Sequence, residues 1–295
     1  MYDRLLQLMF PTLFSIGKLN ISSFNVFLVL SFLYGIFLVW RLVRAWDIDE
    51  EKSLDLTFLT LAGGLIGSRI IFVLEHLEVF IRSLPKIILI YQQPGFSAWG
   101  GVVSGFLTLY FFSRRFKIDY WQVSDLGAVA FLGSLILANL GCLPGGCDTV
   151  NVFGSGRKFP VAGIEALLLL AAFLKIWPVA THFHIRGKVV SLVLINLGII
   201  RLLTAALRQI RPAGYLSALI LIATGTILFY RVTKRNFKQD LKNYFELGHK
   251  IFTDSDTRKS MMQSFSKWWY NQKTSFVWKV NNMKKRIRRL YVRSS

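Results

Sequence analysis

Four charged residues lie in or beside long apolar stretches of this sequence, and they are its strongest candidates for chemistry. The clearest is Arg201, in the middle of the run GKVVSLVLINLGIIRLLTAALRQ, Gly187–Gln209. A charged side chain that deep in hydrocarbon costs at least about 2.5 kcal/mol, so it normally faces a protein interior or a water-filled cavity. Because a guanidinium binds two oxygens of an anion at once, and of a phosphate above all, the sequence predicts an anion site within a membrane protein.

The other three charges could complete or balance this site. Arg208 shares one helical face with Arg201 and Ala205 and lies nearer the outer surface, so the two arginines would form a ladder. Glu165, in PVAGIEALLLL, is either a catalytic group or the structural counter-charge of Arg201 or Arg69. Arg69 lies toward the outer end of its own apolar run, where its side chain could also reach the membrane interface.

Composition indicates that membrane-spanning helices position these residues. The 295 residues are 53% hydrophobic with a mean hydropathy of +0.46, which excludes an ordinary soluble domain. Apolar stretches of about 20 residues, enough to cross a bilayer, recur along the chain. They are continuous and do not alternate with polar residues, which favours helices over a barrel. We predict an all-α integral membrane protein with about seven spans: Phe24–Trp40, Leu56–Leu74, Gly95–Phe112, Leu126–Leu143, Pro160–Trp177, Val189–Leu207 and Leu216–Val232.

Basic residues set the expected orientation. In an arrangement with the N-terminus outside, Lys and Arg in the loops divide eight against eight between the two sides, which decides nothing. From Thr233 to Ser295, however, 16 Lys or Arg stand against 4 Asp or Glu. We therefore expect this tail in the cytoplasm, where anionic lipid attracts it. The chain then divides into a multi-span membrane domain, residues 1–235, and a basic, aromatic tail, residues 236–295.

The tail mixes its basic residues with aromatic ones, as in SFSKWWYNQKTSFVWKVNNMKKRIRRLYV. This mixture is typical of a segment that lies on a membrane surface with tryptophans at headgroup level. It is also found where proteins bind single-stranded nucleic acid. In an integral membrane protein we expect membrane lipids as the partner and no nucleic acid.

Glycines cluster where helices would meet. Gly63 and Gly67 have the spacing G-x-x-x-G, and so do Gly101 and Gly105, which allows helix backbones to approach closely. Packing alone explains these pairs. Gly100 and Gly101 also follow soon after Pro94-Gly95, so a helix that starts there could offer free amides to an anion.

Two cysteines, Cys142 and Cys147, lie in ANLGCLPGGCDTV at the outer end of the fourth predicted span. They form either a local disulfide or two inert thiols. Two thiols alone do not complete a tetrahedral zinc site, and we expect no metal or cofactor.

The order of motifs resembles the prolipoprotein diacylglyceryl transferase family of bacterial membrane enzymes with seven spans. The resemblance covers about Ser15 to Arg235 and rests on six segments in order: the opening SIG, IGSRIIFVLE, GFSAWGGVVSG, SDLGAVAFLGSLILANLGCLPGGC, FPVAGIEALL and LGIIRLLTAALRQ. They are similar, from the second onward, to the family's G-x-R-I, S-F-H-G-G, G-R-L-G-N, H-P-S/T-Q-L-Y-E and G-x-x-R-x-x-x-E-x-x-R.

This resemblance implies an activity and its partners. The family moves the diacylglyceryl group of phosphatidylglycerol onto the lipobox cysteine thiol of a preprolipoprotein. A thioether forms and glycerol phosphate leaves. This chemistry needs a cation to hold the phosphate, a base for the thiol proton, and a lipid-accessible central cavity that admits acyl chains and a signal peptide.

The resemblance also assigns site residues. It implies catalytic roles for Arg201, the match to the family's essential sixth-span arginine, and for Glu165. It implies phospholipid binding by six further residues of the matched motifs: Arg69, Gly100, Gly101, Asn139, Gly141 and Arg208. Pro160 and Gly146 also match.

The chain departs from the family pattern at five of its polar positions. The residues found there are Trp99 for histidine, Asn139 for arginine, Cys147 for glutamate, Phe159 for histidine and Ala205 for glutamate. The usual histidine base and one of two key arginines are therefore absent. The function predicted from the sequence is the transferase, and its alternative is a catalytically weakened or inactive relative that binds phospholipid or a lipoprotein precursor. A third possibility is an unrelated transporter, for which an internal repeat is expected and none is evident.

Overall fold

The protein is represented by a computed structural model, which describes residues 12–16, 19–81, 95–145, 149–151, 158–182, 184–208 and 212–243 and scattered residues between 246 and 282. It consists of two compact units, Met1–Lys234 and Arg235–Ser295. Cys147 and Gly146 lie outside the described residues.

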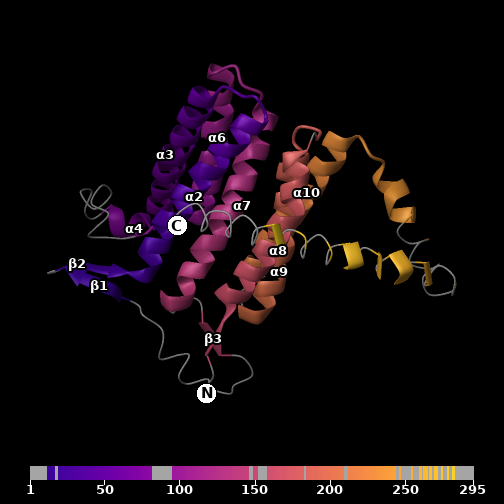
Figure 1. Ribbon diagram of the computed structural model, residues 1–295. Helices are drawn as coiled ribbons and strands as arrows, with labels where there is room; N and C mark the ends of the chain where they lie inside the picture. Colours follow the sequence, from indigo (N-terminus) through magenta and orange to yellow (C-terminus); the bar gives the residue numbers. More distant parts are fainter. Residues whose placement is uncertain are drawn as a thin grey trace, which may run out of the picture. The chain divides into compact units, whose positions relative to one another are not determined.

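The first unit is a helical bundle with two small β-hairpins (Figure 1). The hairpins are antiparallel and pair β1 (Thr12–Ile16) with β2 (Leu19–Ser22), and β3 (Thr149–Asn151) with β4 (Lys158–Pro160). The helices are α2 (Ser23–Ala45), α3 (Glu50–Glu75), α4 (Leu77–Phe80), α6 (Ala98–Arg115), α7 (Tyr120–Gly145), α8 (Val161–Thr181), α9 (Lys188–Arg208) and α10 (Pro212–Thr233).

Six of these helices are long and apolar enough to cross a membrane: α2, α3, α7, α8, α9 and α10. The all-α membrane fold is thereby confirmed. The third predicted span, α6, is not among the six; it has 18 residues and ends with Arg114 and Arg115.

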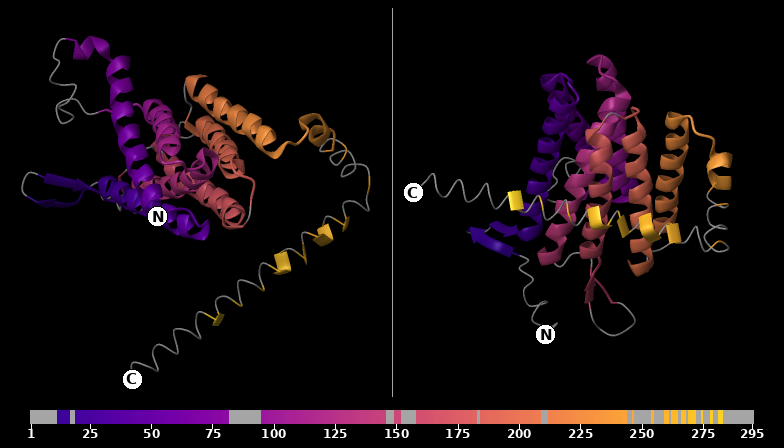
Figure 2. Two further views of the ribbon diagram at one scale, coloured as in Figure 1. Left: turned by 90° about the horizontal axis from the view of Figure 1, so that it is seen from above. Right: turned by 45° about the vertical axis from the view of Figure 1, so that its right-hand side comes forward.

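Four helices form the core. Buried apolar side chains of α2, α7, α8 and α9 make one continuous cluster, in which Val43, Val129 and Val189 are fully buried. The α3–α6 pair packs beside α2 and α7, and α10 packs on α9 (Figure 2). Trp46, just after α2, donates from its indole nitrogen to the Ala180 carbonyl at 2.9 Å and ties α2 to α8.

Glycines bring α3 and α6 together, as their spacing predicted. A Cβ atom added to Gly63 would lie 2.1 Å from the Thr108 hydroxyl, and one added to Gly67 would lie 2.1 Å from Ser104 Cβ. Helix backbones can approach this closely only where a side chain is missing. The packing interpretation of these glycines is confirmed.

The seven long helices alternate in direction, so the bundle has two distinct ends (Figure 1). At one end short connections join α2 to α3, α6 to α7 and α8 to α9, and α10 ends there; we call this the turn end. At the other end are the two hairpins and α4; we call this the hairpin end. This alternation decides which sequence motifs become neighbours.

Candidate functional site

The candidate site residues all fall in the half of the bundle toward the hairpin end. Arg69 lies near the end of α3, and Gly100 and Gly101 lie in the first turn of α6. Asn139 and Gly141 are near the end of α7, and Glu165 is near the start of α8. Arg201 is in the second half of α9 and Arg208 is its last residue. Segments that are distant in sequence therefore share one level of the bundle.

Arg201 is exposed although it projects from the packed side of α9. The four residues one turn away on its face are all buried: Leu197, Gly198, Thr204 and Ala205. Its guanidinium has no hydrogen bond or ion pair with any residue that the structure describes. Arg201 lies seven residues from the end of α9, which is about 10 Å along the helix axis. A free guanidinium at that depth can bind an anion without first breaking a contact.

Arg208 and Glu165 form an ion pair. Arg208 Nη2 donates to Glu165 Oε2 at 2.5 Å, and the two side chains are 22% and 11% exposed. The sequence predicted that Glu165 is either a catalytic group or the counter-charge of Arg201 or Arg69. The predicted ion-pair partners were wrong, because Glu165 pairs with Arg208, and the catalytic role stays a prediction. The partner of Glu165 depends on the axial register between α8 and α9. Residue spacing within either helix does not reveal that register. The pairing holds Arg208 and leaves Arg201 without a counter-charge in the part of the chain that the structure describes.

Arg69 fixes the start of α6. It is 8% exposed, donates from Nη1 to the Gly95 carbonyl at 2.9 Å, and lies over the rings of Phe72 and Phe80. Its side chain therefore packs within the protein; that it reaches the membrane interface stays a prediction. Ser97, the N-cap of α6, donates from its hydroxyl to Glu75 Oε1 at 3.0 Å. Together these bonds position the backbone that precedes α6.

The two glycines at the start of α6 are engaged in packing. Gly100 is buried against Ile71, and its amide donates to the Ser97 hydroxyl at 3.4 Å. The amide of Gly101 donates to the Ser97 carbonyl at 3.0 Å. Trp99, in the same turn, is 45% exposed. Binding of an anion by these amides stays a prediction.

The end of α7 carries the remaining candidates. Asn139 donates its side-chain amide to the Leu135 carbonyl at 2.9 Å, within its own helix. Gly141 is buried, and a Cβ there would lie 2.3 Å from Phe27 Cβ, so this glycine lets α7 approach α2. Cys142 is disulfide-bonded, which decides between the two readings of that cysteine.

The sequence did not predict a polar network that lies at the turn end. Three helices start at this end, and each start is met by an aspartate that accepts hydrogen bonds from backbone amides: Asp49 for α3, Asp119 for α7 and Asp125 for α9. Ion pairs surround them, Arg44 with Glu50, Lys52 with Asp49 and Arg186 with Asp119. Such carboxylates satisfy amides that have no partner within the helix.

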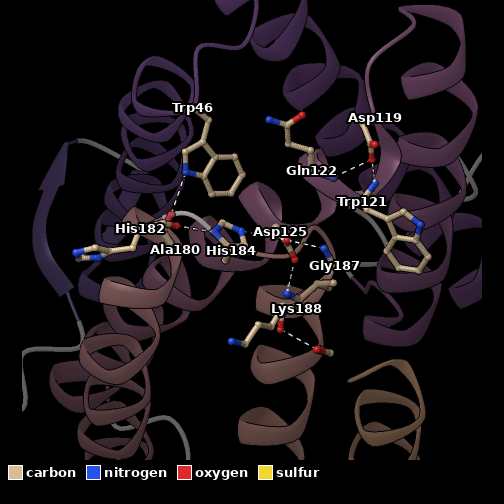
Figure 3. A network of polar contacts seen from close by, with 12 residues as sticks. Trp46, Asp119, Trp121, Gln122, Asp125, Ala180, His182, His184, Gly187 and Lys188 are labelled. Atoms are coloured by element: carbon tan, nitrogen blue, oxygen red, sulfur yellow. Dashed lines mark hydrogen bonds and ion pairs between the residues drawn. The ribbon is translucent and has the colours of Figure 1, made fainter. Parts of the chain in front are cut away.

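Asp125 is the centre of this network (Figure 3). It is fully buried and accepts from the Gly187 and Val190 amides, both at 2.7 Å. Gly187 has a positive φ of 86°, which favours glycine at this turn. His184 Nε2 lies 3.3 Å from Asp125 Oδ2, and the hydrogen bond to this carboxylate raises the pKa of the imidazole above its ordinary value. A lone aspartate in the apolar run SDLGAVAF was the signal that could have identified it.

Comparisons with known proteins agree with the arrangement. Residues 11–231 match the family described as prolipoprotein diacylglyceryl transferase. Three proteins named phosphatidylglycerol–prolipoprotein diacylglyceryl transferase are similar. One from Deinococcus radiodurans is 29% identical over 48% of this chain and 43% of its own length. One from Serratia proteamaculans is 27% identical over 78% and 81%, and one from Wigglesworthia glossinidia brevipalpis is 22% identical over 81% and 89%. With three quarters of its length matched to the family, its apolar helices in place and its motifs gathered at one level, the chain belongs to the prolipoprotein diacylglyceryl transferase family.

Proposed function

We propose that this protein transfers the diacylglyceryl group of phosphatidylglycerol to the lipobox cysteine of a prolipoprotein, a step of lipoprotein biosynthesis. Membership of the family supports the reaction class and both substrates. The observation that carries the proposal onto this chain is Arg201, whose side chain is exposed among buried neighbours and has no partner among the described residues.

Arg201 binds the phosphate of the lipid and stabilises it as it leaves. The cysteine sulfur attacks the glyceryl carbon, a C–S bond forms, and the C–O bond to the phosphate breaks. Negative charge collects on the departing glycerol phosphate. A guanidinium directed at that charge lowers the barrier, and loss of one such donor commonly costs about 10²- to 10³-fold in rate.

The thiol proton needs an acceptor other than the family's histidine, which is Trp99 here. Cys142 is disulfide-bonded and does not titrate, so it cannot serve. Glu165 is held by Arg208 and orients it, and we assign Glu165 this positioning role beside its family match. The oxygen of the departing phosphate, next to Arg201, is the acceptor that the substrate itself supplies. The proton then leaves with glycerol phosphate and the charges balance.

The remaining candidates surround the phosphate site. We assign Arg69, Gly100, Gly101, Asn139, Gly141 and Arg208 to the walls that receive the lipid, in a cavity accessible from the bilayer. The protein is a bacterial multi-pass membrane protein. We place it in the cytoplasmic membrane with its N-terminus outside and its tail in the cytoplasm, because the tail and the exposed turn-end residues Arg41, Arg114 and Lys117 are basic.

The test is transfer of labelled diacylglyceryl from phosphatidylglycerol to a lipobox peptide by the purified chain in vesicles. We expect a thioether product, a loss of about 10²-fold or more in Arg201→Ala, and partial retention in Arg201→Lys, which keeps the charge without the fork. The matched control is Arg231→Ala, which removes an exposed arginine from the other end of the bundle and is expected to leave the rate unchanged.

Two outcomes would contradict the proposal. Equal rates in Arg201→Ala and the unsubstituted chain would remove Arg201 from the mechanism. No product from the unsubstituted chain, with phosphatidylglycerol still bound, would instead favour the inactive relative that binds lipid, which is the reading suggested by Trp99 and Phe159.

A further inference from the structure

Two connections at the turn end share one backbone geometry. Asp47, between α2 and α3, and Lys117, between α6 and α7, have positive φ angles of 53° and 57°. The next residue, Ile48 or Ile118, donates its amide to the carbonyl five residues earlier, at 3.1 and 2.9 Å. Each connection then has an aspartate whose carboxylate accepts from the amide three positions on. We call α2 with α3 the first repeat, and α6 with α7 the second.

The correspondence continues along the helices. Identical residues stand 70 positions apart: Ile48-Asp49 and Ile118-Asp119, Asp55-Leu56 and Asp125-Leu126, Gly63 and Gly133, and Leu65-Ile66 and Leu135-Ile136. The packing agrees, because α3 packs mainly on α6 as α2 packs mainly on α7. This is the arrangement of two repeats related by an approximate two-fold rotation along the bundle. The similarity is too sparse to stand out in the sequence, and the shared turns align it.

One face of the second repeat is covered by α8 and α9. Asp125 is fully buried on that face and accepts hydrogen bonds from two backbone amides at the start of α9. Leu132 and Ile136 lie on the same side of α7 and are buried in the core cluster that α8 and α9 complete. The chain enters α9 at the turn end with two basic residues and continues as an apolar run, RGKVVSLVLINLGII.

The equivalent face of the first repeat is exposed, at the edge of the bundle that α3 forms (Figure 1). Asp55, Ala62 and Ile66 correspond to the three buried residues of α7, and all three are exposed. Phe58 and Leu65, which are 55% and 51% exposed, lie between them on the same side. We call this set, together with the residue one turn earlier, the outer strip of α3: Glu51, Asp55, Phe58, Ala62, Leu65 and Ile66.

Two carboxylates stand at the turn end of the outer strip. Glu51 and Asp55 are exposed and one helical turn apart, and neither carboxylate has a hydrogen bond or ion pair with any residue that the structure describes. The neighbouring acids Asp49 and Glu50 are already in ion pairs. Like charges at this spacing repel each other, so the strip favours a partner with a basic end.

We propose that the outer strip of α3 binds the signal peptide of the prolipoprotein as a helix. The basic start of the peptide contacts Glu51 and Asp55, and its apolar part lies along Phe58–Ile66. This inference rests on the proposed function, which supplies the substrate. A signal peptide has a positively charged start followed by about 7 to 15 apolar residues. It therefore has the same order of charge and hydrophobicity as α9, which occupies the equivalent face of the second repeat.

The direction and length of the outer strip suit this substrate. The basic start of a signal peptide stays in the cytoplasm, where we place the turn end. From Asp55 to Arg69 the helix rises about 21 Å, the length of an apolar helix of about 14 residues. Arg69 lies on the same side of α3, at the level of the other candidate site residues. The end of the peptide that carries the cysteine thus reaches the hairpin end.

Initial transfer rates test the acidic end of the outer strip. The full chain is assayed in micelles that contain phosphatidylglycerol, with a signal peptide that starts with lysines. Asp55→Lys should raise KM about tenfold or more, because like charges then meet, and should leave kcat within about twofold. The matched control is Asp47→Lys, the same charge change at the same end; Lys117 shows that lysine adopts this positive φ. A peptide that starts with glutamates should be used better by Asp55→Lys than by the unsubstituted chain.

Crosslinking tests binding without the reaction. A photoreactive phenylalanine analogue is placed at Phe58 or, as the matched control, at Leu174 of α8, which is 62% exposed and lies at a similar distance from the turn end. The peptide carries serine in place of its cysteine, so no thioether forms. We expect a crosslink from position 58, its loss when Asp55→Lys is added, and no crosslink from position 174.

The outcomes separate this inference from the proposed function. Transfer with no crosslink from position 58, or equal rises in KM for Asp47→Lys and Asp55→Lys, would overturn the inference and leave the transferase standing. A crosslink from position 58 without any transfer to the cysteine peptide would support the binding strip and contradict the transferase. A crosslink from position 58 to phospholipid alone would overturn the inference and make the strip an ordinary lipid-facing surface.

Discussion

The two ends of the bundle differ in how their charged residues are paired. At the turn end, aspartates meet the starts of three helices, and the surrounding charges are largely paired. At the hairpin end, Arg201 has no partner among the described residues, and long connections separate α3 from α6 and α7 from α8. If the proposed reaction takes place at Arg201, stability and chemistry lie at opposite ends of the bundle. A change at the turn end should therefore lower stability first, and one at the hairpin end should lower activity first.

The largest effect on stability is expected for Asp125→Ala. The substitution leaves two buried amides and His184 without their acceptor, and each orphaned buried group costs about 1 to 3 kcal/mol. We expect a loss of about 3 kcal/mol or more in thermal unfolding in detergent. Ser124→Ala, one residue earlier and also buried, is the matched control. A full loss of transfer activity in Asp125→Ala at unchanged stability would break the comparison.

Arg208→Ala tests whether a stabilising contact also exists at the hairpin end. It leaves Glu165 mostly buried without its partner, which should cost about 2 to 4 kcal/mol, less than for a completely buried pair because Arg208 is partly exposed. Changing Glu165→Gln as well should recover much of that stability, because no charge is then stranded. If Arg208→Ala unfolds at the same temperature as the unsubstituted chain, the ion pair contributes no stability. The stabilising polar contacts would then be concentrated even more at the turn end.

Gly63→Ala and Gly105→Ala form a matched pair on the α3–α6 interface. A methyl group at Gly63 meets the stiff Thr108 side chain at 2.1 Å, whereas one at Gly105 has its nearest neighbour at 4.0 Å. Gly63→Ala should cost about 1 to 3 kcal/mol from overpacking, and Gly105→Ala should be neutral or slightly stabilising. Thermal unfolding of both variants measures the difference. Equal effects would mean that the helices separate without cost.

The smallest expected effect is a pH dependence at the turn end. The pKa of His184 is raised by its hydrogen bond to Asp125, with burial and, more weakly, Lys188 opposing the rise. The stabilisation from the protonated imidazole is therefore fully present below about pH 6.5 and is lost as the pH rises through the higher folded-state pKa. His184→Gln should flatten that part of the curve of unfolding temperature against pH. A curve that keeps its slope in the variant would assign the titration elsewhere.

Sequence reasoning predicted the helices well and their ends less well. The predicted span at Leu56 begins at Glu50 in the structure, and the one at Leu126 begins at Tyr120. An apolar run marks only the part of a helix that lies in hydrocarbon. The polar first turns, capped by Asp49 or preceded by Asp119, continue the helix beyond it.

The site was predictable to a smaller extent. The position of Arg201 inside a long apolar helix followed from the sequence, because a continuous apolar run of that length predicts one membrane-spanning helix. The role of Arg201 stays a prediction. The partner of Glu165 and the contact of Asp125 with the start of α9 did not follow, since they depend on contacts across 43 and 62 residues of sequence. Local periodicity carries no information about the register between two helices.

The packing of α2 constrains the order in which the helices can pack during synthesis. Its principal neighbour is α7, which begins 75 residues after α2 ends. At a synthesis rate of about 5 to 20 residues per second, about 4 to 15 seconds pass between the end of α2 and the start of α7. The α3–α6 pair is complete before α7 emerges, so this glycine-rich pair can form while α2 still lacks its principal neighbour.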